Sequence, residues 1–234
     1  MSPEPASLVW LFDVDGTLLL TQGAGRDALV LALREVYGIE DDLGTIPFAG
    51  RTDILIVNDI AERHGIVFGP GERERFFERV VAHMRVIMDP PRGGLLPGVR
   101  TLLEAVNAEP GWVSALLTGN ERNMAHIKLT AFGIWDRFEW GTFGDEGPDR
   151  NAIARLAVQR AAERHGVTPE RCVVVGDTEH DVACARAAGA RAVAVSTGGR
   201  HRDTLQECDP DLLLEDLTDI DTLWAWARGG GIST

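Results

Sequence analysis

The segment Leu8–Leu18 constrains the fold more than any other part of this chain. An apolar run of strand length, Leu-Val-Trp-Leu-Phe, leads into two aspartates separated by one residue, Asp13 and Asp15, and then into Gly16 and Thr17. Side chains alternate between the faces of a strand, so these carboxylates can share a side where the strand ends. Gly16 then allows a sharp turn. Two carboxylates at the end of a buried strand need a cation, and oxygen-only ligands favour Mg²⁺.

The composition limits the partners that such a site can have. The chain has 234 residues, 44% of them hydrophobic, which suffices for one large domain or for a domain plus a smaller one. A net charge of −13 argues against nucleic acid and anionic membranes as main partners. An anionic substrate must therefore be held by local cations and a metal. The only lysine is Lys128, which we expect to be a solvated residue in the middle of a helix.

The cysteines and the start of the chain bear on localisation. Cys172, Cys184 and Cys208 have neither paired spacing nor a zinc-site pattern. An odd number of cysteines without a secretory segment predicts a cytoplasmic protein. The first apolar run is interrupted by Asp13 and Asp15 and lacks a basic leader and a cleavage site. We therefore predict neither a signal peptide nor a membrane span.

Residues 19–93 show helical patterns only. Helices are predicted over residues 26–37, 52–64 and 70–88. The first ends at Gly38, the second begins with a Thr-Asp capping signal and ends at Gly65, and the third is closed by Pro90-Pro91. Gly23 and Gly25 on one side, and a Pro/Gly cluster at residues 90–94 on the other, are typical of hinges. We predict an all-helical insertion that acts as a lid.

The rest of the chain alternates between helix and strand. Strands are expected at residues 112–117, 138–142, 171–175, 191–195 and 212–214, and helices at 99–106, 122–132, 149–165, 181–188 and 217–227. This alternation predicts an α/β fold with a parallel sheet covered by helices on both faces. In such sheets, ligands bind beyond the carboxyl ends of the strands.

Two further strand ends carry residues suited to a phosphate and a metal. Thr118, Gly119 and Asn120 offer a hydroxyl and backbone N–H groups to a phosphate, and the alternative is that they cap the following helix. Asp177 and Asp181 again place carboxylates just beyond an apolar strand, where they could bind a metal or cap a helix. Together with Asp13 and Asp15, they favour a metal site at one edge of the sheet.

The motifs resemble those of the haloacid dehalogenase superfamily. Asp-x-Asp-Gly-Thr from Asp13 resembles its nucleophile motif, and Gly176-Asp177-x-x-x-Asp181 resembles its acidic fourth motif. The resemblance covers essentially the full length and extends to the phosphoglycolate phosphatase-like branch. It implies a Rossmann-like core of residues 1–18 and 94–234, with an inserted helical cap of residues 19–93.

This resemblance also implies roles for individual residues. Asp13 would be the nucleophile that forms an aspartyl-phosphate, and Asp15 the general acid and base. Mg²⁺ would be held by the Asp13 carboxylate, the Asp15 backbone carbonyl and the Asp177 carboxylate, with Asp181 acting directly or through water. Arg150 stands where the family places its stabilising cation, commonly a lysine.

The phosphate-binding segment and the cap complete these expectations. Thr118, Gly119 and Asn120 resemble the superfamily's second motif and would bind phosphate. In the cap, Arg51 either contacts substrate or lies beside a helix cap formed by Thr52.

The function implied is magnesium-dependent hydrolysis of a small phosphorylated metabolite that resembles phosphoglycolate. The enzyme would be a monomer or a homodimer. There are two alternatives. One is a phosphosugar mutase that uses the same aspartyl-phosphate, and the other is a non-catalytic phosphate-binding module. A dehalogenase would not need Asp15, and a phosphonate hydrolase would need a cap lysine. Neither the substrate nor the role of His180 follows from the sequence.

Overall fold

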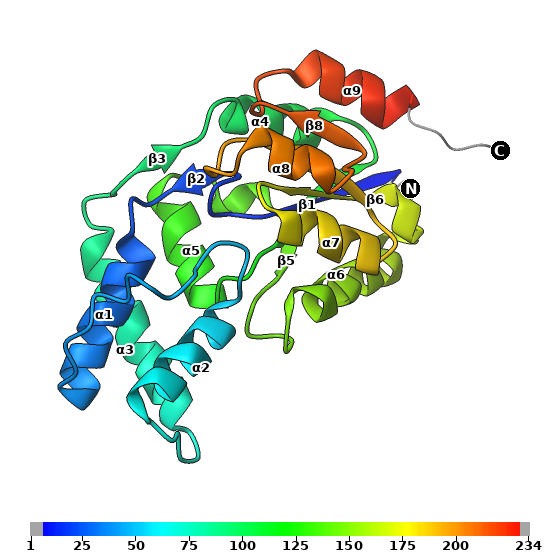
Figure 1. The fold of residues 1–234 in the computed structure, drawn as a ribbon. Coiled ribbons are helices and arrows are strands. Elements are labelled where there is room, and N and C mark those ends of the chain that lie inside the picture. The colour runs from blue at the N-terminus through cyan, green and yellow to red at the C-terminus, as the bar shows by residue number, and fades with distance from the viewer. Residues whose placement is uncertain (1–6, 230–234) are drawn as a thin grey trace.

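The computed structural model of this protein describes residues 7–229 and consists of an α/β core with a helical cap (Figure 1). Six parallel strands form one sheet in the order β5-β4-β1-β6-β7-β8. The strands are β1 (Leu8–Phe12), β4 (Trp112–Leu117), β5 (Trp140–Thr142), β6 (Cys172–Gly176), β7 (Arg191–Val195) and β8 (Leu212–Leu214). The predicted Rossmann-like fold class with an inserted helical cap is confirmed.

The alternation of side chains along β1 feeds two separate hydrophobic layers. Trp10 and Phe12 pack into one layer and Val9 and Leu11 into the other. Helices that cover the first face are α4 (Val99–Ala108), α5 (Arg122–Ala131) and α9 (Ile220–Gly229). Helices that cover the second face are α6 (Arg150–His165), α7 (Glu179–Ala187) and α8 (Arg202–Glu207), and Figure 1 shows α6 and α7 across the sheet from α4 and α9. Both faces of the sheet are therefore buried, and its strand ends are the place left for a ligand.

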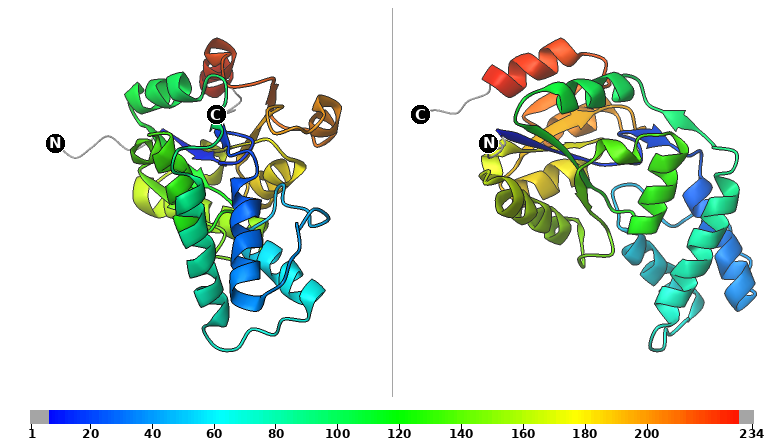
Figure 2. Two further views of the ribbon diagram at one scale, coloured as in Figure 1. Left: turned by 90° about the vertical axis from the view of Figure 1, so that its left-hand side faces the viewer. Right: turned by 180° about the vertical axis from the view of Figure 1, so that it is seen from behind.

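The cap has its own hydrophobic core. It contains α1 (Ala24–Tyr37), α2 (Asp53–His64) and α3 (Glu72–Ile87), which form a lobe beside the carboxyl ends of the strands (Figures 1 and 2). Apolar side chains from all three helices pack together, and Met124 from α5 of the core joins them. The cap thus rests against α5.

The expectation of helices throughout residues 19–93 is wrong at the first two residues of the cap. Leu19–Leu20 (β2) pairs antiparallel with Gly94–Leu95 (β3), so a short two-stranded ribbon joins cap and core. Two residues are too few to produce an alternating pattern in the sequence. Gly93 has a positive φ of 95°, and a Cβ there would collide with the backbone of Leu20. Glycine is therefore required where the two linkers cross.

Most helix ends follow the sequence signals. Gly38, Gly65 and Gly166 adopt the left-handed conformation after α1, α2 and α6. Helix α7 begins two residues earlier than predicted because Thr178, rather than a later residue, is its N-cap. The thiols of all three cysteines are free. Across residues 7–229, every helix is too short or too polar to cross a membrane.

Candidate active site

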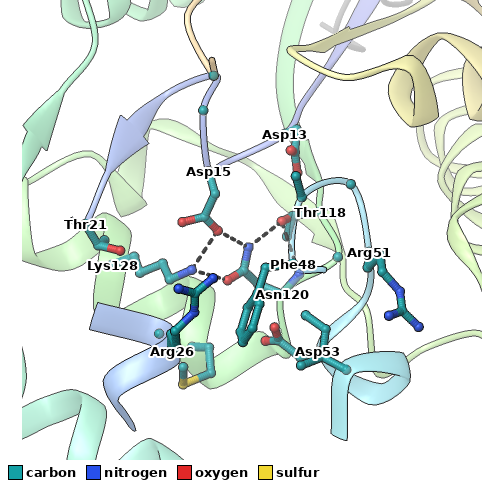
Figure 3. Close-up of a pocket in the computed structure, with 18 of the residues that line it drawn as sticks. Asp13, Asp15, Thr21, Arg26, Phe48, Arg51, Asp53, Thr118, Asn120 and Lys128 are labelled. Atoms are coloured by element: carbon teal, nitrogen blue, oxygen red, sulfur yellow. Dashed lines mark hydrogen bonds and ion pairs between the residues drawn. The ribbon is translucent and has the colours of Figure 1, made fainter. Parts of the chain in front are cut away.

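A cavity of about 430 Å³ lies between the strand ends of the core and the cap. Its core wall comes from the ends of β1, β4 and β6, and its cap wall from α1, α2, α3 and the loop before α2. The predicted residues Asp13, Asp15, Thr118, Asn120 and Asp177 all line it, and Figure 3 shows most of them. Residues more than 100 positions apart in the chain therefore meet at one edge of the sheet, as the parallel topology requires.

The turn after β1 sends the two predicted aspartates to different partners. Asp13 N–H donates to Val175 O at 2.9 Å, which continues the β1–β6 pairing to the last residue before the turn. Gly16 follows with a φ of 83°. The Asp13 carboxylate contacts the Arg150 guanidinium at 3.3 Å, whereas the Asp15 carboxylate faces α5. The two acids line one cavity but lie in different surroundings.

Three buried carboxylates converge at the end of the sheet. Ligand atoms of Asp13, Asp177 and Asp181 all lie within 4.8 Å of one another, and each residue is at most 6% exposed. A Cβ on Gly16 or Gly198 would collide with the Asp177 carboxylate, so two glycines leave room for it. Burial and then the neighbouring Asp13 charge raise the pKa of Asp177 to about 7. A close set of oxygen donors with excess negative charge fits a hard divalent cation such as Mg²⁺.

Asp181 also caps a helix, which is the alternative role expected for it. Its Oδ2 accepts hydrogen bonds from the backbone N–H and the hydroxyl of Thr178, at 3.0 and 2.6 Å, and so forms a capping box for α7. Its Oδ1 pairs with Arg150. Capping of the helix and membership of the acidic cluster are therefore compatible, since they use different oxygens.

The structure brings Arg150 to the position that the family resemblance implied. It is the first residue of α6, whose N-cap is Asp149, and is only 7% exposed. Its guanidinium contacts both Asp13 and Asp181. Its Nε is buried and meets no acceptor within the part of the chain that the structure describes. This cation offsets part of the charge of the carboxylate cluster.

The loop after β4 supplies hydrogen-bond donors beside Asp13. Thr118 Oγ1 accepts from the backbone N–H and the side-chain amide of Asn120, at 3.2 and 2.8 Å. The N-cap of α5 is Glu121, so Thr118, Gly119 and Asn120 do not have the capping role that we considered for them. Among the described residues, no acceptor engages the Gly119 N–H or the Thr118 hydroxyl hydrogen. These donors remain for a ligand.

The expectation that Lys128 faces solvent is wrong. It is 5% exposed, lines the cavity, and donates to Asp15 Oδ2 and Asn120 Oδ1, each at 2.6 Å (Figure 3). A signal was present in the sequence: Met124, Ala125 and Leu129 are apolar, and Lys128 follows Met124 by one helical turn. Lys128 therefore lies on the buried face of α5 rather than the exposed one.

The cap contributes two arginines with different environments. Arg51 lines the cavity, but its guanidinium pairs with Asp59 of α2, and Figure 3 shows it directed away from Asp15. The Thr52 hydroxyl accepts a hydrogen bond from Leu55 N–H and caps α2, which is the helix cap expected from the sequence. Arg26 of α1 stacks on the Phe48 ring at 4.9 Å and extends toward Asn120 (Figure 3). Within residues 7–229, Arg26 forms no ion pair.

The cap touches the core directly above the site. Asp53 N–H donates to Gly119 O, and Asp53 Oδ2 accepts from Glu121 N–H, both at 2.8 Å. Burial raises the pKa of Asp53 to about 6, although the positive charge of Lys128 opposes the shift. His180 packs against Gly50, where a Cβ would collide with its ring. In this structure the cap is therefore closed over the cavity.

Comparison with known proteins identifies the family. A model of haloacid dehalogenase-like hydrolases matches residues 10–186, and a second hydrolase-like model matches residues 153–220. The chain belongs to the haloacid dehalogenase-like hydrolase family. The first match contains Asp13, Asp15, Thr118, Arg150 and Asp177, which form the core wall of the cavity.

Relatives of this chain include phosphoglycolate phosphatases. The chain is 30% identical to a phosphoglycolate phosphatase of Xylella fastidiosa over 91% of its own length and 92% of that protein. It is also 30% identical to a phosphoglycolate phosphatase of Nitrosococcus oceani, over 58% of this chain and 60% of that protein. This chain is accordingly an enzyme of the phosphatase type.

Solved structures at lower identity share the fold. A β-phosphoglucomutase from Clostridium difficile superposes with a TM-score of 0.73 at 18% identity, and covers 96% of this chain and 98% of that one. A predicted phosphoglycolate phosphatase from Haemophilus somnus has a TM-score of 0.72 at 22% identity, with coverages of 94% and 98%. One architecture therefore carries two reactions, and the fold does not decide between them.

Proposed function

We propose that this protein is a magnesium-dependent phosphatase that hydrolyses a small phosphomonoester through an aspartyl-phosphate. The observation that carries the proposal is the convergence of Asp13, Asp177 and Asp181 with Arg150 beneath a cap-covered cavity. Residues 1–18 and 94–234 would be the catalytic core and residues 19–93 the cap that selects the substrate.

Asp13 acts as the nucleophile. Its carboxylate attacks phosphorus, so an Asp13 oxygen–phosphorus bond forms while the ester oxygen–phosphorus bond breaks. Arg150 lies 3.3 Å from Asp13, where its charge offsets the charge that develops on the phosphoryl oxygens. The Thr118 hydroxyl hydrogen and the Gly119 N–H, which no described acceptor engages, are donated to the same oxygens, while Asn120 supports the loop.

Asp15 moves the protons. It donates one to the leaving oxygen as the ester bond breaks, and the resulting carboxylate then takes one from water. That water attacks phosphorus, the bond to Asp13 breaks, and inorganic phosphate is released.

The acidic cluster would hold the metal. The Asp13 and Asp177 carboxylates and the Asp15 backbone carbonyl would be its ligands from the protein. Both carboxylate oxygens of Asp181 already have partners, which favours contact through a water. Mg²⁺, when bound, supplies positive charge to the phosphoryl oxygens.

The substrate must fit a cavity with a charged core wall and a largely apolar cap wall. The cap wall is lined by the apolar side chains of Leu29, Phe48, Phe77 and Val80. It also contains Arg26, which has no ion-pair partner within residues 7–229. A volume of about 430 Å³ exceeds what a two-carbon acid phosphate such as phosphoglycolate needs. Phosphoglycolate is named in the relatives and belongs in the test panel, beside larger phosphomonoesters.

Trapping of the covalent intermediate tests the proposal. The protein is incubated with Mg²⁺ and a panel of phosphomonoesters, quenched in acid and examined by intact mass for one added phosphoryl group. We expect the adduct on wild type, and on Asp15→Asn in larger amount because its hydrolysis is slowed. Asp13→Asn should show neither adduct nor turnover, with a loss of about 10⁴-fold or more. An adduct on Asp13→Asn would contradict the assignment of the nucleophile.

The same assay separates the alternatives. The solved structures with this fold include a β-phosphoglucomutase, so hexose 1-phosphates belong in the panel. Appearance of the 6-phosphate isomer in place of free phosphate would identify a mutase. Binding without adduct, isomer or phosphate would identify a non-catalytic module.

A further inference from the structure

The single lysine of this chain, Lys128, is buried in the active-site cavity and holds an acid on which the proposed function depends. Its Nζ donates to Asp15 Oδ2 and to Asn120 Oδ1, both at 2.6 Å. The side chain is 7% exposed. A buried ammonium group loses its hydration, so it is retained only where it has strong partners. This ion pair joins residues 113 positions apart in the chain.

The contacts of Asp15 are unequal between its two oxygens. Oδ2 accepts from Lys128 and, at 2.8 Å, from the Asn120 side-chain amide. Among the described residues, none donates to Oδ1. Figure 3 shows the engaged oxygen directed toward Lys128 and Asn120 and the other oxygen pointing away from them. The carboxylate therefore has one oxygen for anchoring and one for chemistry.

Asn120 is itself held in one orientation. Its amide nitrogen donates to Thr118 Oγ1 and Asp15 Oδ2, and its oxygen accepts from Lys128. An amide placed between a donor and two acceptors cannot rotate by 180° without losing all three bonds. Thr118, Asn120, Lys128 and Asp15 thus form one fixed network that joins β4, α5 and the turn after β1.

Resting on the proposed function, we propose that Lys128 is a positioning residue for proton transfer. Lys128 and Asn120 fix Oδ2, so that Oδ1 carries the proton to the leaving oxygen. In this step the bond from Asp13 to phosphorus forms, the ester bond breaks, and the Oδ1 proton passes to the departing oxygen. Asp15 is left as a carboxylate paired with Lys128.

This role predicts a dependence on the leaving group that a structural ion pair would not cause. A nitrophenolate departs without a proton, whereas an alkoxide needs one as the bond breaks. The measured quantity is kcat/KM, which covers steps up to departure of the first product and excludes hydrolysis of the aspartyl-phosphate. The two substrates are para-nitrophenyl phosphate and ethyl phosphate, neither of which carries a second anionic group.

For Lys128→Met we expect a loss of kcat/KM of about 100-fold on ethyl phosphate and less than about fivefold on para-nitrophenyl phosphate. Lys128→Arg, which keeps a donor cation, should recover part of the loss on ethyl phosphate. Arg155→Met removes an exposed positive charge from α6 and should alter neither value. Thermal unfolding monitors the fold, and Lys128→Gln replaces Lys128→Met if the latter does not fold.

Asp15→Asn, measured in parallel, separates failure of this inference from failure of the proposed function. If Asp15→Asn is selective for ethyl phosphate but the Lys128 variants lose both substrates equally, Lys128 is a structural residue and the inference is wrong. If Asp15→Asn also loses both equally, Asp15 is not the acid and the proposed function itself needs revision. Unchanged kinetics in all Lys128 variants would likewise overturn the inference.

Discussion

The two sides of the cavity differ in how completely their charges are paired. On the core side, Asp13, Arg150 and Asp177 are at most 7% exposed, and each contacts an ionic or hydrogen-bonding partner from another core element. On the cap side, Arg26 has no carboxylate partner within residues 7–229, and its guanidinium lies over the ring of Phe48. Groups fixed in advance suit a reaction at one phosphoryl group, whereas an unpaired cation suits recognition of what that group is attached to.

Between the two sides lies the junction formed by Asp15, Asn120 and Lys128. These residues belong to the core, but Lys128 Nζ would lie 3.9 Å from a Cβ on Gly25 of the cap helix α1. Cap closure therefore reaches the group that holds the proposed acid. Substitutions on the core side should reduce activity on every substrate alike, and substitutions on the cap side should depend on the substrate.

After loss of the nucleophile, removal of the metal should give the largest effect. Chelation should lower turnover by about 10³-fold or more on every substrate, and Mg²⁺ should restore it. Calcium should activate poorly because its coordination shell is larger and less regular. Thermal unfolding gives an independent readout: Mg²⁺ should raise the midpoint of wild type, since ligands that bind only the native state stabilise it.

Asp177→Asn is the matched control for this experiment. It should lose most of the Mg²⁺-dependent rise in midpoint while the metal-free protein stays folded. Full activity after exhaustive chelation, or an unchanged Mg²⁺ effect in Asp177→Asn, would show that the acidic cluster is not the metal site.

How much of this the sequence could predict differs between the two sides. The core side follows from local patterns: an apolar strand before Asp13, a second before Asp177, and a capping aspartate before Arg150. Parallel topology alone brings those strand ends together. Arg150 was placed by the family resemblance, and the structure puts it beside Asp13.

The cap side and the junction depend on contacts that no local pattern encodes. Lys128 pairs with Asp15 across 113 positions of the chain. Strands β2 and β3 have two residues each, which is too short for an alternating pattern to appear in the sequence. The sequence suggested Arg51 as a substrate contact because it precedes a helix cap, yet its guanidinium pairs with Asp59. No pattern within the first cap helix indicated that Arg26 faces the cavity. Charge pairing across a cavity is a tertiary property, so the sequence located the cap without indicating which of its cations is free.

Replacement of Arg150 tests the core side next. Arg150→Ala should lower kcat/KM by about 10² to 10³-fold, and equally on para-nitrophenyl phosphate and ethyl phosphate, because both present the same phosphoryl group. Lys128→Met differs by its selectivity, so the ratio of the two kcat/KM values distinguishes the two cations. If Arg150→Ala proves selective for ethyl phosphate, Arg150 acts on the leaving group, and the expectation that core-side residues affect all substrates alike is wrong.

Arg26→Ala should give a smaller, substrate-dependent effect. Phosphoglycolate and ethyl phosphate are similar in size, but only the first carries a carboxylate. We expect KM for phosphoglycolate to rise about tenfold, as for loss of one charged contact, and KM for ethyl phosphate to stay within about twofold.

Arg51→Ala provides the comparison within the cap. Because the Arg51 guanidinium already pairs with Asp59, its removal should change KM for phosphoglycolate less than removal of Arg26 does. The reverse order would assign substrate recognition to Arg51, as its position before α2 first suggested.

The smallest effect is expected at Asp53, and it concerns stability rather than activity. Burial raises the pKa of Asp53 from 3.8 to about 6, so the folded protein holds a proton at this site that the unfolded chain has already released. Ionisation of Asp53 therefore lowers the free energy of unfolding progressively as the pH rises from about 4 to about 6, and the penalty stays constant above that range. The upper limit of this penalty on the free energy of unfolding is about 3 kcal/mol.

The variant Asp53→Asn tests this expectation. Asparagine can still accept from Glu121 N–H without a charge, so Asp53→Asn should match wild type near pH 4 and become the more stable protein near pH 7.5. Denaturant unfolding at the two pH values measures the difference. A stability gap that does not change with pH would mean that the Asp53 carboxylate is not destabilised by its burial between cap and core, and that Lys128 offsets its charge in full.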